Sequence, residues 1–232
     1  MTNTDESEFA QQHPKDGEKF TALIQMARPG WTTDVFPVKD GVFPADLSRC
    51  DGAMITGSPT SVHCGEAWVD QLQELIRQMV WARVPVFGAC FGHQVIALAL
   101  GGEVGRNPDG WVHGLTENRL EARPDWAVGL PDPVHLYGSH AEQVTRLPEG
   151  ARVWASGPGC PASGMLIGDS VMTTQHHPEM SPTFIHALTE EMSDLLGPER
   201  TAQAFQTLKT RSDQARFAEG LAQFFESAQP KT

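Results

Sequence analysis

The chain has 232 residues, and its 29 acidic against 17 basic side chains give a formal net charge of −12 with histidine neutral. This charge disfavours nucleic acid as a main partner, because a polyanion is bound through clustered lysine and arginine. Hydrophobic residues make up 40%, and the 22 glycines bring the apolar share to about half, which excludes a disordered or collagen-like chain. The length favours one domain over residues 1–232, with room for a core that needs no disulfides.

The N-terminal residues do not read as a signal peptide, because Met1–Ala10 carries three acidic residues and lacks a basic start followed by an apolar stretch. We therefore expect a cytoplasmic protein. The longest strongly apolar run, Val95–Leu100, is far shorter than the ~20 residues that a membrane span requires. The cysteines form no CxxC pair, which indicates working or buried thiols rather than a disulfide framework. They are Cys50, Cys64, Cys90 and Cys160.

The first half of the chain alternates between strand-like and helix-like segments. Residues 1–19 are polar, and the apolar spacing from Phe20 to Ala27 predicts a first helix that Pro29 and Gly30 end. The patterns that follow predict three strands and two helices in alternation. The strands are Thr33–Val38, Asp51–Thr56 and Val84–Gly88, and the helices are Glu66–Ala82 and Gly92–Leu100. This alternation is typical of an α/β protein with a parallel sheet covered on both faces.

The middle of the chain, Glu103–Gln175, changes character to short β-like pieces separated by proline and glycine, which predicts a small antiparallel insertion. The pieces are Leu115–Glu121, Val134–Tyr137, Ala151–Ala155, Met165–Ile167 and Val171–Gln175. Ser181 and Pro182 then supply an N-cap and a first-turn proline for a helix that continues to Leu195. Two closing helices are expected within residues 199–228, over Glu199–Leu208 and Asp213–Ala228.

A strand that turns directly into a helix carries the clearest chemical signal. Gly88-Ala89-Cys90-Phe91-Gly92 follows the buried strand and is typical of a nucleophile elbow, in which a tight turn leaves no room for side chains beside the nucleophile. The positive end of the following helix favours a thiolate, and the Phe91 N–H lies where an oxyanion would form. We predict Cys90 as the nucleophile and Phe91 as an oxyanion donor.

A cysteine nucleophile requires a base and a group that orients the base, and Gln175-His176-His177-Pro178-Glu179 offers both after a predicted strand. Residues two apart in an extended segment share a side, so Glu179 can hold the His177 imidazole against Cys90. Both segments end at the carboxyl edge of a parallel sheet, where sites form. We interpret three other histidines, each taken alone, as structural and not catalytic residues: His135, His140 and His176.

A second oxyanion donor is expected from another loop at the same edge. Thr56-Gly57-Ser58-Pro59 ends a predicted strand there, and Gly57 allows the backbone to approach closely. An ordinary strand-ending turn is the alternative interpretation of this segment.

These segments together resemble the class I (triad) glutamine amidotransferase domain. The elbow Gly88–Gln94, the segment Gln175–Glu179 and the segment Ile55–Pro59 carry the resemblance, which extends to stand-alone members including the γ-glutamyl peptidase branch. Further similar segments cover nearly the whole chain, at Asp40–Pro44, Asn107–Trp111, Ser139–Val144 and Leu147–Gly150. The resemblance implies an open, mostly parallel, doubly wound flavodoxin-like sheet.

The resemblance also implies a chemistry. The Cys90 thiolate would attack the side-chain carbonyl of glutamine or of a γ-glutamyl amide and leave a γ-glutamyl thioester that water hydrolyses, with His177 moving the proton. Gly57 and Phe91 would stabilise the oxyanion. The residues expected to hold the glutamyl end are Ser58, Gln94, Ser139 and His140. The partner is then a small-molecule substrate, and no cofactor or metal is implied.

The chain departs from the family pattern in three places. Ala89 replaces a larger branched residue, and His176 stands where relatives often carry Phe or Gly. Members of the family begin with a strand before the first helix, whereas here only Thr2–Asp5 resembles the end of one. We hypothesise that the natural start lies upstream, or that this strand is missing from the core.

Several functions stay open at this point. The first is a free-standing γ-glutamyl amide hydrolase, and the second is a glutaminase subunit that delivers ammonia to a separate synthase, since no GxxxxGK[ST] stretch exists in this chain. A metal hydrolase using His176, His177, Glu179 and a further histidine is disfavoured, because adjacent residues in a strand point to opposite sides. An inactive binding module is disfavoured by the intact triad.

Overall fold

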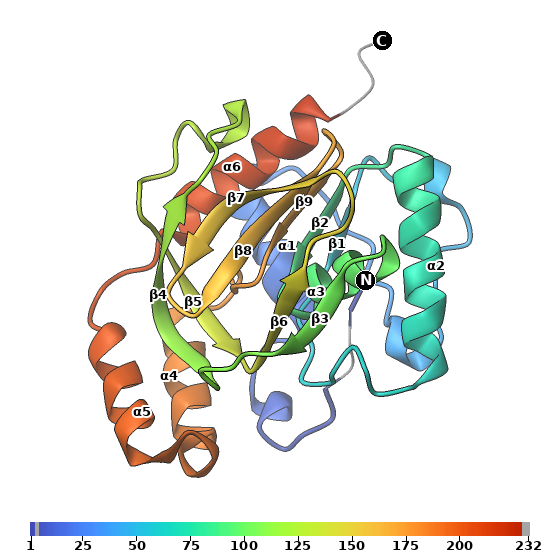
Figure 1. Ribbon diagram of the computed structural model, residues 1–232. Coiled ribbons are helices and arrows are strands. Elements are labelled where there is room, and N and C mark those ends of the chain that lie inside the picture. The colour runs from blue at the N-terminus through green and yellow to red at the C-terminus, as the bar shows by residue number, and fades with distance from the viewer. Residues whose placement is uncertain (3–4, 229–232) are drawn as a thin grey trace.

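The structure is a computed structural model that describes residues 1–2 and 5–228. Within these residues, seven strands form a twisted central sheet in the order β1-β2-β9-β8-β7-β4-β5 (Figure 1). In chain order the strands are β1 Ala53–Ile55, β2 Val86–Ala89, β4 Val112–Leu120, β5 Val134–His140, β7 Ala151–Gly157, β8 Cys160–Ile167 and β9 Val171–Thr174. β1, β2 and β9 run parallel, and the pairs from β9 outward to β5 are antiparallel.

Helices cover both faces of this sheet. They are α1 Asp16–Ala27, α2 Ala67–Trp81, α3 Phe91–Ala99, α4 Pro182–Glu191, α5 Ser193–Thr207 and α6 Gln214–Ser227. α1 and α6 pack on one face, around Phe87 and Trp154, and α2 and α3 pack on the other, around Val86 and Val171 (Figure 1). Val86 and Phe87 belong to opposite faces because successive side chains of a strand alternate. The predicted α/β class, with an antiparallel addition, is confirmed.

The antiparallel addition is larger than the sequence indicated. β8, β7, β4 and β5 continue the central sheet, and a separate two-stranded sheet is formed by β3 Glu103–Arg106 and β6 Glu142–Arg146. Neither of these two strands was predicted. β3 has only four residues with mixed exposure, so it carries too little period-two patterning to be recognised.

Two predicted elements are wrong in detail. Thr33–Val38 forms no strand, because only an isolated bridge pairs Thr2 with Pro37, and Pro37 has no N–H to donate to a ladder. The helix expected to continue to Leu195 ends at Glu191, and α5 begins at Ser193. α5 itself bends at Gly197, whose φ of 77° no helix adopts, immediately before Pro198.

The remaining helix predictions agree with the structure. α2 and α3 match the segments expected at 66–82 and 92–100 within one residue at each end, and Gly101 follows α3 with a φ of 90°. The Ser181 hydroxyl accepts the N–H of Phe184 at 3.1 Å, so the predicted N-cap of α4 is confirmed. The two closing helices correspond to the later part of α5 and to α6.

Met1 and Thr2 lie at the place of the first strand of the expected sheet, where Thr2 forms an isolated parallel bridge with Pro37. These residues lie between β1 and the segment 36–38 and hydrogen-bond to both. Asn3 and Thr4, which the sequence places in the same strand end, lie outside the described residues.

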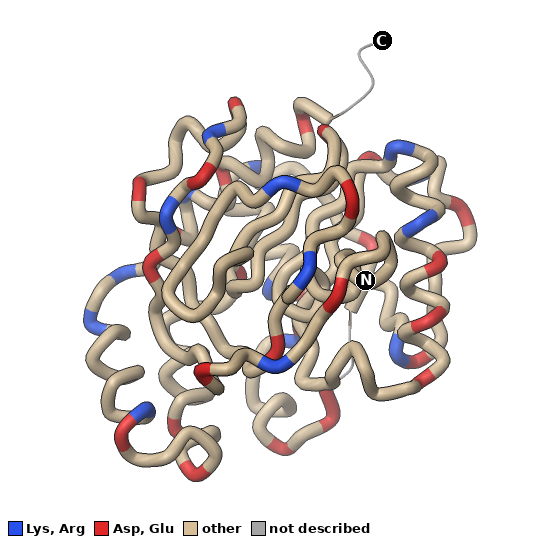
Figure 2. Tube along the Cα trace, viewed as in Figure 1, with Lys and Arg blue, Asp and Glu red and all other residues tan. Residues whose placement is uncertain are grey.

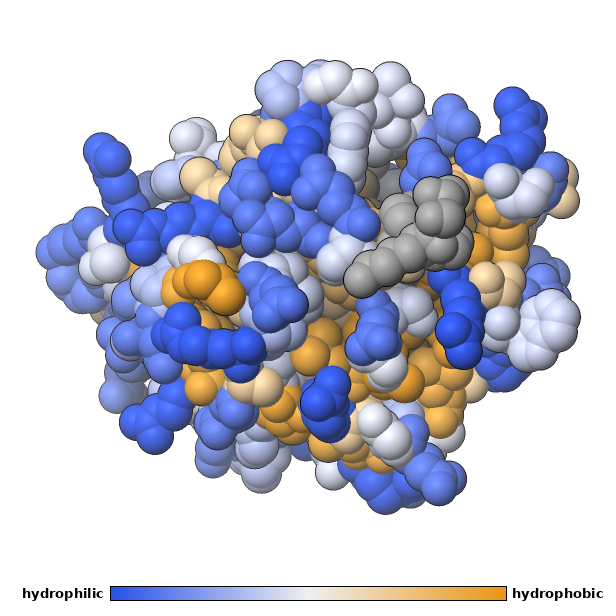
Figure 3. Space-filling view, turned by 90° about the horizontal axis from the view of Figure 1, so that it is seen from above, coloured by the Kyte–Doolittle hydropathy of each residue, from blue (hydrophilic) through white to orange (hydrophobic). Residues whose placement is uncertain are grey.

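Basic and acidic residues are interspersed along the chain. In the view of Figure 2, lysine and arginine lie singly among acidic residues. Seen from above, the molecule is mostly hydrophilic, with hydrophobic side chains visible in the recesses between polar ones (Figure 3). Among the described residues, no helix combines the length and the apolar character needed to cross a bilayer.

Candidate active site

Cys90 lies at the junction of β2 and α3 in a backbone conformation that few side chains adopt. Its φ is 50° and its ψ is −105°, and its N–H donates to the Thr174 carbonyl at 2.9 Å, which ties the turn to β9. Such strain persists only where the surroundings impose it, and it is concentrated at functional sites. The nucleophile elbow expected from Gly-x-Cys-x-Gly is therefore present.

The two glycines of the elbow are required by close contacts. A Cβ added at Gly88 would lie 2.5 Å from Ile96 Cδ1, and one added at Gly92 would lie 2.3 Å from the Ile55 carbonyl oxygen. The second contact brings α3 directly against the end of β1. The Cys90 side chain thus sits at the N-terminal end of α3, where the partial positive charge of the helix end stabilises negative charge.

His177 and Glu179 lie beside this cysteine on the segment after β9. The His177 N–H donates to the Tyr137 carbonyl at 2.7 Å, and its ring Nδ1 lies 2.7 Å from Glu179 Oε1. Both side chains are buried. The antiparallel bridge to Tyr137 on β5 thereby fixes where the imidazole is presented.

The electrostatics of His177 favour its protonated form. Burial alone would lower the pKa of His177, but the charge of Glu179, the charge of Cys90 and hydrogen bonds to both side chains raise it well above its usual range. An imidazolium between a thiolate and a carboxylate is the arrangement that a cysteine nucleophile and its base require. The structure therefore brings the three predicted triad residues together.

Gly57, which the sequence predicted as an oxyanion donor, lies beside His177 and Cys90. A Cβ added there would lie 2.8 Å from His177 Cε1 and 3.7 Å from Cys90 Cβ, so a larger residue would displace the imidazole. The neighbouring Thr56 carbonyl accepts the Gly92 N–H at 3.1 Å, which fixes this loop to the start of α3. Phe91, the other predicted oxyanion residue, is the first residue of α3 and is buried.

The four residues predicted to hold the glutamyl end differ in their surroundings. The Ser139 carbonyl oxygen lies 4.0 Å from Cys90 Sγ, whereas the Ser58 hydroxyl accepts the Thr60 N–H at 2.9 Å within its own loop. Gln94 Nε2 donates to the Glu142 carbonyl at 2.8 Å, and His140 Nδ1 lies 3.0 Å from the same oxygen. Gln94 and His140 therefore fasten the loop that places Ser139 against the nucleophile.

Sequence reasoning missed His113, a residue of β4. Its Nδ1 lies 3.1 Å from Ser139 Oγ and its Nε2 lies 2.9 Å from Thr189 Oγ1, so it connects the end of β5 to α4. Burial lowers the pKa of His113 to about 4, which keeps the ring neutral. A single histidine in a β-like segment does not show in the sequence which distant side chains it will contact.

Asp16 was missed as well. It lies in the first turn of α1, and its carboxylate pairs with Lys19 at 3.1 Å. Burial raises the pKa of Asp16, with Lys19 opposing and the nearby charge of Glu179 adding to the effect. The start of α1 thus lies on the Glu179 side of the candidate site.

Three further histidines form a buried cluster behind the site. The rings of His140 and His176 lie 5.6 Å apart, and His93 Nδ1 lies 2.7 Å from Thr173 Oγ1. Burial lowers the pKa of His93 to about 3, that of His140 to about 4 and that of His176 well below its usual value. His176, the departure from the family pattern, is therefore a neutral buried residue. Across residues 1–2 and 5–228, no group of three or more His, Cys, Asp or Glu side chains is arranged to hold a metal ion.

The family model of glutamine amidotransferase class-I matches residues 21–190, which is more than half of the chain. The chain belongs to the class-I glutamine amidotransferase family. Gamma-glutamyl peptidase 3 of Arabidopsis thaliana is 30% identical to this family member over 187 residues, which cover 76% of this chain and 75% of that protein. The predicted family resemblance is confirmed.

Two other relatives are longer than the matched region. The glutamine-hydrolysing GMP synthase of Aeropyrum pernix is 34% identical over 156 residues, which cover 67% of this chain and 29% of that protein. A Saccharomyces cerevisiae relative that carries the same family name is 36% identical over 156 residues, 64% of this chain and 62% of that protein. The chain thus spans less than two thirds of both relatives.

Solved structures share the class-I glutamine amidotransferase fold. A glutamine amidotransferase from Methylobacillus flagellatus aligns with a TM-score of 0.77 at 23% identity, covering 92% of this chain and 90% of that one. A glutamine amidotransferase from Thermotoga maritima aligns with a TM-score of 0.74 at 17% identity, covering 85% and 88%. These likenesses support the α/β architecture described above.

Proposed function

We propose that the protein hydrolyses the γ-glutamyl amide bond of glutamine or of γ-glutamyl compounds with a Cys90–His177–Glu179 triad, through a γ-glutamyl thioester. The observation that carries the proposal is the buried His177, whose Nδ1 lies 2.7 Å from Glu179 Oε1 and whose ring, like Cys90, lies directly beside Gly57. A cytoplasmic site of action, predicted from the N-terminal sequence, belongs to the same proposal.

In the first half-reaction, Cys90 Sγ attacks the carbonyl carbon of the γ-amide and forms a C–S bond. The carbonyl oxygen takes up negative charge, and the backbone N–H groups of Gly57 and Phe91 are the proposed donors to it. Protonated His177 then gives its proton to the leaving nitrogen, the C–N bond breaks, and ammonia or an amine departs. The γ-glutamyl thioester remains on Cys90.

In the second half-reaction, His177, now neutral, takes a proton from a water molecule that attacks the thioester carbonyl. The C–S bond breaks, glutamate or its derivative leaves, and Cys90 returns to the thiolate beside the protonated imidazole. Glu179 stabilises that imidazolium throughout, because its carboxylate is 2.7 Å from Nδ1. Ser58, Gln94, Ser139 and His140 are proposed to shape the space for the glutamyl end.

The similarity to gamma-glutamyl peptidase 3 of Arabidopsis thaliana favours γ-glutamyl compounds among the substrates. The test measures amine release by the isolated chain from glutamine and from a panel of γ-glutamyl dipeptides. A higher kcat/KM on a dipeptide selects the peptidase activity, and a higher value on glutamine selects a glutaminase.

Matched cysteine variants test the chemistry. Cys90→Ala should abolish amine release, whereas Cys64→Ala, which changes an exposed thiol, should leave it intact. Iodoacetamide should inactivate the protein, and glutamine should protect it. Full activity of Cys90→Ala would refute the mechanism.

The alternative proposal is a glutaminase subunit that delivers ammonia to a separate synthase. The similarity to the GMP synthase of Aeropyrum pernix, of which this chain covers 29%, supports it. Steady ammonia release by the isolated chain would exclude strict dependence on a partner, whereas activity that appears only with an added synthase would favour this role.

A further inference from the structure

Thr189 lies on α4, and its hydroxyl proton is used within its own helix. The side chain is fully buried, and its Oγ1 lies 2.7 Å from the Ile185 carbonyl oxygen. A carbonyl oxygen only accepts hydrogen bonds, and a threonine hydroxyl has a single proton, so Thr189 donates that proton to Ile185. Toward any other neighbour, Thr189 Oγ1 is therefore an acceptor.

The neighbour that meets this acceptor is the ring of His113. Its Nε2 lies 2.9 Å from Thr189 Oγ1, so Nε2 carries a proton and donates it. Burial, with the charge of His177 acting in the same direction, lowers the pKa of His113 to about 4, so near pH 7 the ring is neutral and has only one N–H. The other nitrogen, Nδ1, is then unprotonated and only accepts. Thr189 thereby selects the tautomer of His113.

The last member of this chain is the hydroxyl of Ser139, which lies 3.1 Å from His113 Nδ1. An unprotonated Nδ1 requires the hydroxyl to donate. The Met192 sulfur, 3.6 Å from the same hydroxyl, is the other acceptor within reach, but a thioether is a weak one and its choice would leave two lone pairs facing each other across 3.1 Å. In both cases the single proton of Ser139 is used inside the protein, and its oxygen meets a substrate only as an acceptor.

Ser139 lies at the end of β5, beside the nucleophile. The residue is partly exposed, and its carbonyl oxygen lies 4.0 Å from Cys90 Sγ. In the proposed reaction the leaving nitrogen lies on the His177 side, since His177 protonates it. The glutamyl end of the substrate carries an α-carboxylate, which only accepts hydrogen bonds, and an α-ammonium, which only donates them. A hydroxyl that only accepts is complementary to the ammonium and disfavours the carboxylate.

We propose that Thr189 is a positioning residue for substrate binding: through His113 it commits the proton of the Ser139 hydroxyl to the protein, so that this hydroxyl selects the α-ammonium group of a γ-glutamyl compound. The inference rests on the proposed function, because it assigns the orientation of that substrate. It implies that a compound without a free α-amino group loses the contribution of this contact.

Nitrogen NMR of the histidine rings tests the first part of the chain without any substrate. The signals of His113 are assigned by their loss in His113→Phe. We expect a protonated Nε2 and an unprotonated Nδ1 in the unmodified protein, and a population of the opposite tautomer in Thr189→Val, which offers no acceptor. Thr189→Ser keeps the hydroxyl and should keep the tautomer. A proton on Nδ1 of the unmodified protein would overturn the proposal.

Ligand binding tests the second part, in a Cys90→Ala background that does not consume the ligand. Calorimetry compares L-glutamine with glutaramate, which is the same molecule without the α-amino group. Thr189→Val should weaken glutamine binding about tenfold and leave glutaramate binding unchanged, whereas Thr189→Ser should bind both as the parent does. The matched control is Thr201→Val on α5, which also removes a bond to a carbonyl four residues earlier, that of Gly197 at 2.8 Å, and should change neither affinity.

A double variant shows whether Thr189 acts through Ser139. Ser139→Ala should weaken glutamine binding by about the same factor as Thr189→Val. The two substitutions together should weaken it no further, because both remove one contact. Independent, multiplying effects would overturn the proposal.

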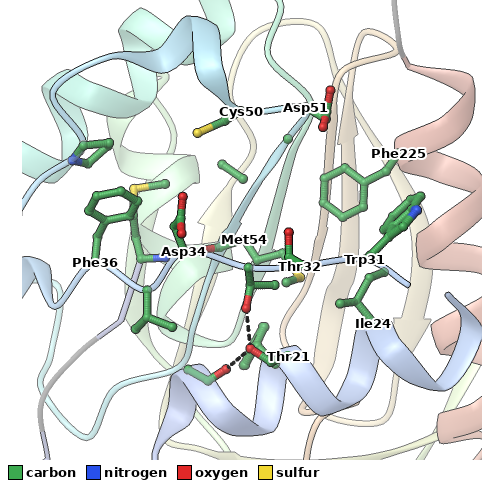
Figure 4. A pocket seen from close by; sticks show the side chains of 18 of the residues that line it. Thr21, Ile24, Trp31, Thr32, Asp34, Phe36, Cys50, Asp51, Met54 and Phe225 are labelled. Carbon is green, nitrogen blue, oxygen red and sulfur yellow. Dashed lines mark hydrogen bonds between the residues drawn. The ribbon is translucent and has the colours of Figure 1, made fainter. Parts of the chain in front are cut away.

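Alkylation of Cys90 separates this role from damage to the nucleophile. In proteins that keep Cys90, iodoacetamide should modify it at the same rate with and without Thr189→Val, because the chain ends at the Ser139 hydroxyl. Cys50 is the internal reference, since it is partly exposed and lines a separate cavity of about 620 Å³ between the segments 31–36 and 50–54 (Figure 4). A slower rate at Cys90 alone would show that the substitution disturbs the elbow, against the proposal.

The binding results and the activity fail separately. Equal weakening of glutamine and glutaramate by Thr189→Val, or no weakening of either, would overturn the inference. Glutamine binding with the expected discrimination, in a protein that releases no amine, would support the inference and contradict the proposed hydrolysis.

Discussion

Glu179 Oε1 lies 2.7 Å from His177 Nδ1, and the residue between them is fixed from a distant helix. Gln214, the first residue of α6, donates from Nε2 to the Pro178 carbonyl at 2.7 Å. The carboxylate and the imidazole are therefore presented by a turn that α6 holds in place. This relationship makes the contribution of Glu179 measurable through the pH dependence of the reaction.

Replacing the carboxylate should weaken the base. Glu179→Gln removes the charge that raises the pKa of His177, so the imidazole loses its proton at lower pH and the alkaline limb of the kcat/KM profile shifts to lower pH. We expect kcat/KM near neutral pH to fall by about 10²-fold. The matched control is Glu190→Gln, which changes an exposed carboxylate on α4. An unchanged profile would remove Glu179 from the triad.

The strain at Cys90 predicts opposite effects on activity and stability. Cys90→Gly should reduce turnover by at least about 10³-fold, because the nucleophile is lost. It should also stabilise the fold by roughly 1–2 kcal/mol, because glycine adopts a φ of 50° without a steric cost, and should raise the melting temperature by several degrees. Cys90→Ala should be equally inactive without this gain. Equal melting temperatures for the two variants would show that the elbow stores no strain.

Gly57 should tolerate no side chain. Gly57→Ala would place a Cβ 2.8 Å from His177 Cε1 and push the imidazole away from Cys90, so we expect kcat/KM to fall by about 10²-fold. Gly30→Ala is the control, since an added Cβ there meets nothing within 4 Å. Steady-state kinetics and circular dichroism together separate a displaced base from a damaged fold. Wild-type activity of Gly57→Ala would contradict the observed packing.

His113 should act through the end of β5, which it positions. His113→Phe removes the bonds to Ser139 and Thr189 while keeping most of the ring volume, so the end of β5 beside Cys90 should loosen. We expect KM for the γ-glutamyl substrate to rise about tenfold, with a smaller change in kcat. His186→Phe, at an exposed position on α4, should change neither parameter. A fall in kcat alone would instead indicate a role in the chemical step.

The buried neutral histidines should make the fold sensitive to acid. The pKa of His140 is about 4 in the folded protein, against an ordinary value of 6.5, so the unfolded chain binds a proton that the folded chain refuses as the pH falls from 6.5 to 4. Stability therefore decreases over this window, by about 3 kcal/mol at pH 4 for His140 alone. His177 does not offset this loss, because its raised pKa gives stability that is already complete below pH 6.5.

Melting temperatures between pH 4 and 7 test this account. His140→Gln should flatten the acid limb relative to the unmodified protein, whereas His135→Gln, at a partly exposed position paired with Asp213, should not. The comparison uses the slope of melting temperature against pH and not the melting temperature itself. A variant that is less stable at every pH therefore remains informative. If melting temperature fell equally steeply with decreasing pH in all three proteins, His140 would not be a cause of the acid sensitivity.

Local patterning in the sequence determined the elements that carry the chemistry. The Gly-x-Cys-x-Gly turn could be recognised because two glycines and a cysteine at fixed spacing reflect contacts within a few residues, and the amphipathic period of α2 reflects its own buried face. His177 and Glu179 were predicted as partners because residues two apart share a side in extended backbone. The structure places both beside Cys90.

Only the tertiary structure decided the contacts between distant segments. His113 reaches Ser139 because β4 and β5 are antiparallel neighbours, and Asp16 approaches Glu179 because α1 packs beside the site; neither contact leaves a trace in local spacing. Thr33–Val38 has the composition of a strand but forms none, since a strand exists only where a neighbouring backbone supplies its hydrogen bonds. Local sequence thus fixed which groups are present, and long-range pairing fixed which of them meet.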